Sequence, residues 1–268
     1  MVNRFRTSAI NLEEVDSKME KIIDIVIPVY NEEESIPVLA SDIHAAMDNC
    51  GENLSWRCIW VDDGSTDATM KQIRILCEKS PQNHSFVHLN GNFGQSAALI
   101  TGFSHCRQNA LIATLDGDAQ NDPSDIPSMI KILEEKKVDM VTGIRVKRHD
   151  NFKRIVSSKI ANGFRNLLTG FQVTDSGCSI RVMKPVCIKK LIPFKGMHRF
   201  LSTLILMNGF SMIEVPVKHR ERKLGKSKYG IGNRLWVGLA DTFAVIWMKH
   251  RLVFAEVKER SDNGFFSE

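Results

Sequence analysis

The chain has 268 residues, of which 43% are apolar, and this is enough for one sizeable hydrophobic core but marginal for two. Its formal net charge of +5 is mild, and much of the positive charge lies in two runs, at residues 145–154 and 218–228. Such runs favour an anionic partner, namely phosphate, a membrane surface or nucleic acid. They carry no recognisable nucleic-acid-binding motif, so we expect no nucleic-acid partner.

The N-terminal segment and the cysteines both point to the cytoplasm. Residues 1–21 are polar and lack the continuous apolar core of a signal peptide, so we expect a polar extension there. The six cysteines show neither CxxC pairs nor a His/Cys ligand spacing. They are expected to be buried thiols of a reducing compartment.

Short apolar runs of strand length alternate with helical patterns along the first half of the chain. Predicted strands lie at residues 22–29, 58–61, 86–89, 111–115 and 138–143. Predicted helices lie at residues 36–47, 70–77, 96–106 and 126–133. This alternation, with short connections, predicts an α/β fold with a mainly parallel sheet that helices cover on both faces.

Polar clusters follow three of these strands, in the stretches "PVYNEEE", "VDDGSTD" and "LDGDAQNDP". Ligands of open α/β sheets bind outside the carboxyl ends of the strands, so three such clusters at one edge predict a site. Asp116 and Asp118 are two residues apart and can point to the same side of an extended segment. Mg²⁺ commonly takes only one or two protein carboxylates, so its other coordination positions stay available to substrate phosphates. Gln120 could add a carbonyl oxygen or orient a metal-bound water.

An ordinary turn is the alternative interpretation of the Asp-x-Asp pair, because Asp, Gly, Asn and Pro are common loop residues. The presence of "VDDGSTD" after another strand favours the site.

The motifs "VIPVYNEEESI", "VDDGSTDAT", "NFGQSAALITG" and "LDGDAQNDP", in this order and spacing, resemble the nucleotide-sugar-binding half of family 2 glycosyltransferases. The later motifs "TDSGCSIRVM", "GMHRFL" and "EVPVKHRERKLGKSKYG" are similar to the branch of dolichol-phosphate mannosyltransferase and bacterial polyprenyl-phosphate glycosyltransferases. The resemblance covers roughly residues 22–250. It implies a GT-A, Rossmann-like catalytic domain over residues 22–230.

The resemblance implies an inverting transfer of a sugar from a UDP- or GDP-linked donor to a polyprenyl phosphate, such as undecaprenyl or dolichyl phosphate, with Mg²⁺ or Mn²⁺ as cofactor. The product would supply lipid-linked sugar for glycan or cell-envelope synthesis. A phosphate acceptor is already largely ionised near neutral pH. Such an acceptor needs cations that hold it and exclusion of water, rather than a strong base.

The resemblance also implies the site residues. Contacts to the nucleotide sugar are expected from Pro28, Tyr30, Glu32, Asp62, Asp63, Asp116, Gln120 and Ser227. The metal ion is expected at Asp116, Asp118 and Gln120, with Asp118 as a direct ligand. Catalytic roles are expected for Asp118, Asp175, Arg181, Arg222 and Lys228, and acceptor contacts for Arg145, His198, Arg199 and Arg220.

Several of these residues also have a second interpretation. Tyr30 could cap the sheet edge, His198 could be structural, and the basic loop at 222–228 could simply face water. In relatives with hydroxyl acceptors the aspartate of a comparable region acts as base, whereas with a phosphate acceptor Asp175 would orient Arg181 or the sugar.

Residues 231–250 predict an amphipathic helix, and the apolar run inside it is shorter than the roughly 20 residues that span a bilayer. Its predicted apolar side comprises Leu235, Trp236, Leu239, Phe243, Ile246 and Trp247. This side could lie on a membrane, pack against the domain or contact a second copy of the chain. Many bacterial relatives continue into two transmembrane helices, whereas residues 251–268 here are polar. We therefore expect a peripheral membrane protein that uses this helix, the basic loops or a separate membrane subunit.

Two rival functions use the same first half of the chain. One is a family 2 glycosyltransferase with a glycan or other hydroxyl acceptor, and the other is a non-catalytic nucleotide-sugar-binding subunit.

Overall fold

The computed structural model describes residues 21–48, 50, 54–145, 162–221 and 234–253. Its centre is a seven-stranded sheet in the order β3-β2-β1-β4-β6-β5-β7. The strands are β1 (Lys21–Val29), β2 (Leu54–Asp62), β3 (His84–His88), β4 (Leu111–Thr114), β5 (Met140–Arg145), β6 (Arg181–Met183) and β7 (Met212–Val217). Only β6 runs antiparallel to its neighbours β4 and β5 among these strands, so the prediction of a mainly parallel sheet is confirmed.

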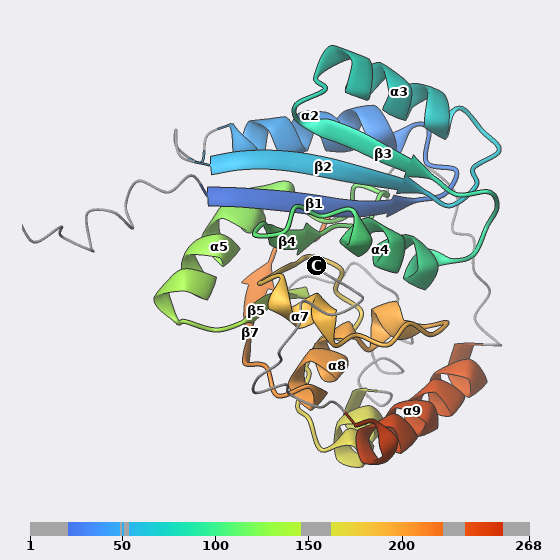
Figure 1. Ribbon diagram of the computed structural model, residues 1–268, viewed down its shortest axis with the longest axis vertical. Coiled ribbons are helices and arrows are strands. Elements are labelled where there is room, and N and C mark those ends of the chain that lie inside the picture. Colours follow the sequence, from blue (N-terminus) through green and yellow to red (C-terminus); the bar gives the residue numbers. More distant parts are fainter. Residues whose placement is uncertain (1–20, 49, 51–53, 146–161, 222–233, 254–268) are drawn as a thin grey trace, which may run out of the picture.

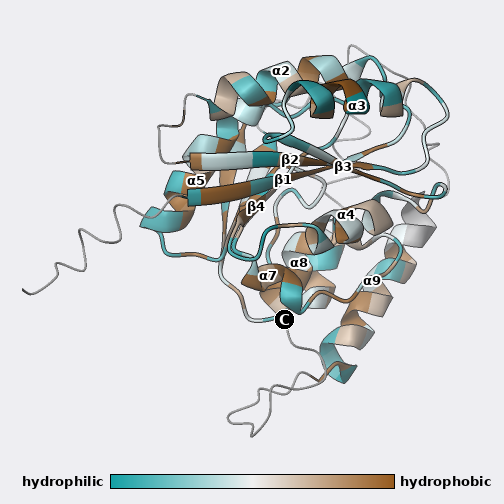
Figure 2. Cartoon of the chain, turned by 45° about the horizontal axis from the view of Figure 1, so that its top comes forward, coloured by the Kyte–Doolittle hydropathy of each residue, from teal (hydrophilic) through white to brown (hydrophobic). Residues whose placement is uncertain are grey.

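Helices cover both faces of the sheet, which gives the α/β layers that the sequence predicts (Figures 1 and 2). The layer on one face contains α2 (Ser35–Met47), α3 (Thr69–Lys79) and α5 (Ile126–Glu135). The layer on the other face contains α4 (Gln95–Ser104), α7 (Val186–Lys189) and α8 (Leu201–Met207). Two short 3₁₀ helices, η1 (Pro123–Asp125) and η2 (Met197–Arg199), connect these elements, and residues 162–169 are also helical.

The first strand shows why a continuous apolar run forms a central strand here. Ile23, Ile25 and Ile27 pack into the cluster beneath α2 and α5, and Val26 packs into the cluster beneath α4. Alternate side chains of a strand point to opposite faces, and both faces of β1 are buried, so its inner positions are apolar apart from Asp24, which is buried in ion pairs.

Two strands are absent from the sequence prediction for identifiable reasons. The strand β6 has only three residues, and its neighbours in the sheet are remote in sequence. The strand β7 contains Glu214 and Pro216 and lies at the edge of the sheet, where a proline is tolerated.

The final helix, α9 (Arg234–Arg251), packs against the domain along one side. Val245 and Met248 join Phe200 in a small apolar cluster. Asp241 accepts a hydrogen bond from Nη2 of Arg199 at 2.9 Å, which fastens the helix to η2. No helix in the described part of the chain combines the length and the apolarity needed to cross a membrane.

Candidate active site

The loop that follows β4 carries the acidic motif, and its backbone explains why a glycine separates the two aspartates. A side-chain carbon at Gly117 would lie 2.5 Å from Cγ1 of Val29 and 3.1 Å from the carbonyl oxygen of Pro28. The loop therefore packs directly on the end of β1. Ala119, two residues further on, has a φ of +55°, a left-handed conformation that few non-glycine residues adopt. Such a conformation persists only where the surroundings enforce it, as at ligand sites.

Asp116 and Asp118 are both half-buried, and each has one carboxylate oxygen in a local hydrogen bond. Oδ1 of Asp116 accepts from Nε2 of Gln95 at 2.8 Å, and Oδ1 of Asp118 accepts from the backbone N–H of Gln120 at 3.2 Å. The side chain of Gln120 donates to the carbonyl of Arg220 at 3.4 Å. These oxygen ligands are the kind that Mg²⁺ and Mn²⁺ prefer.

The motif supplies only part of a metal coordination shell. Within the described residues, no group of three or more His, Cys, Asp or Glu side chains could hold an ion by itself. A pair of carboxylates fits a Mg²⁺ ion that takes its remaining ligands from water and substrate phosphates.

The end of β2 places two buried aspartates at the edge of the sheet where the parallel strands end, and both have partners within the protein. Asp62 accepts from Nδ1 of His88 at 2.7 Å and from the backbone N–H of Ser65 at 3.2 Å. Asp63 accepts from the backbone N–H groups of Phe93 at 2.7 Å and Gly94 at 2.8 Å. Asp63 therefore occupies the amide groups in front of α4 that the glycine-containing motif could otherwise have offered to an anion.

The turn after β2 approaches the next loop closely. Gly64 has a φ of +71°, and a side-chain carbon there would lie 2.5 Å from the backbone of Gly91. Asp67 accepts from the backbone N–H of Thr69 at 3.0 Å, so its side chain stabilises the turn that leads into α3.

The end of β1 carries the remaining residues predicted to bind the nucleotide. Pro28 is buried within the strand, and Tyr30 is half-buried directly after it. Glu32 is buried, its carboxylate accepts from the Ser35 hydroxyl at 3.2 Å, and its backbone N–H donates to Oγ1 of Thr69 at 2.7 Å. Glu32 thus connects the segment after β1 to the first residue of α3.

Arg145 and Asp175 form a buried, two-pronged ion pair at the end of β5. Nε and Nη2 of Arg145 donate to the two carboxylate oxygens of Asp175, each at 2.8 Å, and the backbone N–H of Arg145 adds a third bond at 3.2 Å. Asp175 is 2% exposed. Burial would lower the pKa of Arg145, but the hydrogen bonds and the charge of Asp175 outweigh burial and raise it. Asp175 therefore orients Arg145, whereas the sequence predicted Arg181 or the sugar as its partner.

Arg181 lies at the start of β6, between Thr114 of β4 and Thr142 of β5 in the sheet register. It is 3% exposed, and no carboxylate in the described part of the chain forms an ion pair with it. Burial lowers its pKa, and the charges of Asp116 and Asp175 only partly offset that effect. The antiparallel direction of β6 places its first residue at the edge where the parallel strands end.

His198 is held in one tautomer by Ser96. The Ser96 hydroxyl oxygen accepts from the backbone N–H groups of Gly196 at 3.1 Å and His198 at 3.3 Å, and it lies 2.9 Å from Nδ1 of His198. With its lone pairs engaged, the hydroxyl has its own proton to donate to Nδ1. The ring proton of the neutral imidazole is then on Nε2. Burial and then the charges of Arg199 and Arg181 lower the pKa of His198 to about 3, so the ring is a neutral donor at neutral pH.

The other predicted acceptor residues have partners within the protein. Arg199 pairs with Asp241 of α9. Arg220 bridges Asp42 and Asp122, the latter at 3.0 Å. The predicted contacts at Arg222, Ser227 and Lys228 lie outside the described residues.

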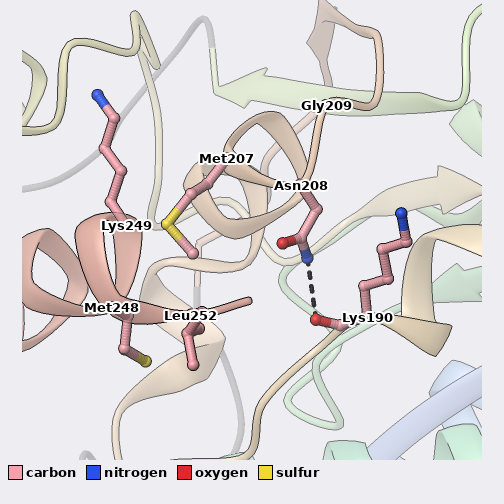
Figure 3. A pocket seen from close by; sticks show the side chains of 7 residues that line it. All are labelled: Lys190, Met207, Asn208, Gly209, Met248, Lys249 and Leu252. Carbon is pink, nitrogen blue, oxygen red and sulfur yellow. Dashed lines mark hydrogen bonds between the residues drawn. The ribbon is translucent and has the colours of Figure 1, made fainter. Parts of the chain in front are cut away.

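A shallow pocket of about 260 Å³ lies between the end of α8 and the last turns of α9 (Figure 3). It is lined by Lys190, Met207, Asn208, Gly209, Met248, Lys249 and Leu252. Nζ of Lys249 is engaged with the carbonyl oxygen of Thr169 at 2.8 Å. None of the predicted site residues lines this pocket, so it does not belong to the strand-end site.

Three residues at or beside this edge were not predicted from sequence. His88 holds Asp62, Ser96 sets the tautomer of His198, and Arg165 is a buried arginine whose Nη1 donates to Oδ1 of Asn162 at 2.8 Å. Ser96 lies inside the "NFGQSAAL" motif, which was a usable signal. Nothing in the local pattern around His88 or Arg165 distinguishes either residue from an ordinary surface residue.

Two curated proteins are similar to this chain over most of its length. A dodecaprenyl-phosphate galacturonate synthase from Rhizobium johnstonii is 37% identical over 232 residues, covering 85% of this chain and 68% of the relative. An undecaprenyl-phosphate 4-deoxy-4-formamido-L-arabinose transferase from Edwardsiella ictaluri is 36% identical over 218 residues, covering 81% of this chain and 65% of the relative. The chain thus spans about two thirds of the length of these curated relatives.

Solved structures support the fold. A mannosyltransferase from Pyrobaculum calidifontis, in complex with GDP-Man and Mn²⁺, matches 87% of this chain and 64% of its own, with a TM-score of 0.58 and 21% identity. A glucosyl-3-phosphoglycerate synthase from Mycobacterium tuberculosis, with Mn²⁺, UDP and phosphoglyceric acid, matches 94% of this chain and 86% of its own, with a TM-score of 0.63 and 15% identity. These neighbours are GT-A enzymes crystallised with a divalent metal ion, and they confirm the GT-A fold class.

The sequence profile of glycosyl transferase family 2 matches residues 24–191, a range that begins within β1 and continues past β6, so it includes the whole acidic loop. This chain belongs to glycosyl transferase family 2.

Proposed function

We propose that this protein is an inverting glycosyltransferase that moves a sugar from a UDP- or GDP-linked donor to a polyprenyl phosphate. The observation that carries the proposal is the meeting of two charge types at one sheet edge. Asp116 follows β4, and its charge acts on Arg145 and Arg181, which begin or end the neighbouring strands. Such an edge suits a substrate pair with two phosphorylated ends, one bound through a metal ion and one through guanidinium groups.

The polyprenyl phosphate acceptor is inferred from the named relatives and from the chemistry of Asp175. Of the two curated relatives, one is named as a synthase of dodecaprenyl-phosphate galacturonate and the other as an undecaprenyl-phosphate 4-deoxy-4-formamido-L-arabinose transferase. Asp175 has both carboxylate oxygens bonded to Arg145, which supports a positioning role and argues against a general base for a hydroxyl acceptor. A phosphate acceptor is ionised already and needs no such base.

In the proposed reaction, an oxygen of the acceptor phosphate attacks the anomeric carbon of the sugar. The bond from that carbon to the diphosphate breaks, and the nucleoside diphosphate leaves. Asp116, Asp118 and Gln120 would hold Mg²⁺ or Mn²⁺, which when bound neutralises charge on the leaving group. Arg145, held by Asp175, and Arg181 would fix the phosphates, and Nε2–H of His198 would donate to the sugar or a phosphate oxygen. The nucleotide would contact Pro28, Tyr30, Glu32 and the Asp62 to Asp63 turn.

We further propose that the protein acts as a peripheral protein at the cytoplasmic membrane face. Phe243 and Trp247 on α9 are 60% and 61% exposed, and Lys249, His250 and Arg251 follow at the end of the helix. Exposed aromatic residues next to basic ones favour the headgroup region of a membrane. A membrane subunit or a second copy of the chain would cover the same residues, and these are the alternative partners.

The proposal is tested by offering the purified protein Mg²⁺ or Mn²⁺, a panel of UDP- and GDP-sugars, and undecaprenyl or dolichyl phosphate in detergent. Mass spectrometry of the lipid fraction detects the product. We expect metal-dependent sugar transfer that Asp118→Ala abolishes and Asp122→Asn retains with the same metal dependence, because Asp122 points to Arg220 and the amide of Ser124. Donor binding without any lipid product would favour a hydroxyl acceptor or a non-catalytic role instead.

A further inference from the structure

Glu214 is a half-buried carboxylate in the edge strand β7. Alternate residues of a strand point to opposite faces of the sheet. Val215 and Val217 pack in the apolar cluster beneath α2 and α5, and Met212 packs against the cluster on the opposite face, beneath α4. Glu214 shares the face of Met212, two residues further along the strand. A carboxylate on a covered face needs hydrogen-bond partners within the protein.

The partners of Glu214 are backbone groups of the loop that carries Asp175. The N–H of Thr174 donates to both carboxylate oxygens of Glu214, at 2.9 and 3.0 Å, and the N–H of Asp175 donates to one of them at 3.3 Å. Hydrogen bonds to a charged acceptor are roughly twice as strong as those between neutral groups. Glu214 therefore fixes the backbone from which the Asp175 side chain departs.

The same loop closes tightly around Arg145. The two carboxylate oxygens of Asp175 accept from Nε and Nη2 of Arg145, each at 2.8 Å. The backbone N–H of Cys178 donates to the carbonyl oxygen of Asp175 at 3.1 Å, which closes a turn. Within that turn, a side-chain carbon at Gly177 would lie 2.9 Å from Nη2 of Arg145. The Arg145 guanidinium can therefore change its position only if the loop moves as well.

Two asparagines hold the loop from the helical segment at residues 162–169. Nδ2 of Asn162 donates to the carbonyl oxygen of Thr174 at 2.8 Å. Asn166 makes one bond to each backbone group of Val173, at 3.1 and 3.2 Å. The asparagines reach residues 173 and 174, whereas the charged side chain of Glu214 also reaches the N–H of Asp175 itself.

We propose that Glu214 is a positioning residue for the transfer reaction: it holds the loop so that Asp175 presents the Arg145 guanidinium to a substrate phosphate. The proposal rests on the proposed function, which assigns Arg145 to a substrate phosphate. Glu214 itself touches no substrate and acts through Asp175 and Arg145. Its removal therefore weakens substrate binding only in a protein that still contains Arg145.

The test uses two variants of Glu214 and one matched control. Glu214→Gln keeps the size of the side chain but replaces one accepting oxygen by an N–H₂ group, and Glu214→Asp keeps the charge on a shorter side chain. Asp139→Asn is the control, because the Asp139 carboxylate also accepts from a backbone N–H, that of Ser211 at 2.9 Å, but at the opposite end of β7 from the site. Each substitution is made in the wild type and in Arg145→Met, and kcat, both KM values and the melting temperature are measured.

We expect Glu214→Gln to raise about 10-fold the same KM that Arg145→Met raises, the size for weakening a hydrogen bond to a charged group. In the Arg145→Met background, Glu214→Gln should change that KM by less than about twofold, because the group that it positions is gone. Glu214→Asp should recover part of the loss. Asp139→Asn should lower the melting temperature and leave KM unchanged in both backgrounds. The proposal is overturned if Glu214→Gln lowers the melting temperature without raising KM, or raises KM equally with and without Arg145.

An NMR measurement separates this proposal from the proposed function, because it needs no substrate. The Nε–H group of Arg145 gives a ¹⁵N–¹H signal, which is assigned by its loss in Arg145→Met. We expect hydrogen exchange of this proton to be about 10-fold faster in Glu214→Gln and unchanged in Asp139→Asn. If the wild type transfers no sugar to any lipid, the proposed function fails, and this signal still decides the role of Glu214: faster exchange in Glu214→Gln supports it, and exchange equal to that of the wild type refutes it.

Discussion

The ion pair between Arg145 and Asp175 permits a quantitative test of what Asp175 does. Asp175→Asn keeps the size and shape of the side chain but removes its charge and puts an amide N–H₂ group against the guanidinium. Three hydrogen bonds from Arg145 are weakened or lost, and the Arg145 side chain, 17% exposed, is left without its counter-ion. Removing one partner of a buried pair typically costs about 3–5 kcal/mol, and the residual exposure of Arg145 places this case near 3 kcal/mol.

The measurement is a double-mutant cycle by urea denaturation, with Asp175→Asn, Arg145→Met and the double variant. We expect a coupling energy of about 2 kcal/mol or more, because residues in one buried ion pair are not additive. Transfer activity is measured on the same four proteins. If Asp175 acts by orienting Arg145, the double variant is no less active than either single variant.

The reasoning is refuted by a coupling energy below about 0.5 kcal/mol, the range of independent sites. It is also refuted if Asp175→Asn abolishes transfer while Arg145→Met leaves it intact. That pattern would identify Asp175 as a base and would restore the hydroxyl-acceptor alternative.

Three further predictions concern residues outside this pair. Asp24→Asn should destabilise the protein by about 3 kcal/mol in urea denaturation, because fully buried Asp24 holds Arg57 and Arg107, and KM for both substrates should not change, since Asp24 lies near the start of β1. His84 is buried, and burial followed by the charge of His44 lowers its pKa from 6.5 to about 4, so the unfolded chain binds the proton first. The free energy of unfolding should therefore fall by about 3 kcal/mol between pH 6.5 and 4, and a His84→Gln variant should show a smaller fall. Ser96→Ala should release the tautomer of His198, so that ¹⁵N NMR of the ring shows Nδ1 partly protonated, whereas Ser96→Thr should retain the wild-type spectrum; unchanged ring shifts in Ser96→Ala would contradict the assignment.

The order of the main strands and helices could be read from the sequence because each depends on a local pattern. The run at β1 is apolar at every position except Lys21 and Asp24, since both of its faces are covered, and α5 shows an apolar helical face through Ile126, Met129, Ile130 and Leu133. The strand β6 could not be read, because its three residues carry no pattern of their own. Its place in the sheet depends on β4 and β5, which precede it by many residues.

The site was predictable as a location and much less so as a set of contacts. The polar clusters after β1, β2 and β4 lie at one edge of the sheet as expected, since topology alone brings strand ends together. The partner of Asp175 could not be inferred, because Arg145 precedes it by 30 residues and competes with several other arginines in the sequence. The roles of the predicted site residues in binding and catalysis stay predictions until the variants are measured.

The attachment of α9 has a mechanical consequence. The ion pair between Asp241 and Arg199 joins the helix to η2, and His198 is the residue next to Arg199 in that same short turn. Its ring is in turn hydrogen-bonded to Ser96 at the start of α4. A displacement of α9 would therefore move η2 through this ion pair and through the apolar contacts to Phe200, so a partner that binds α9 would change the alignment of His198.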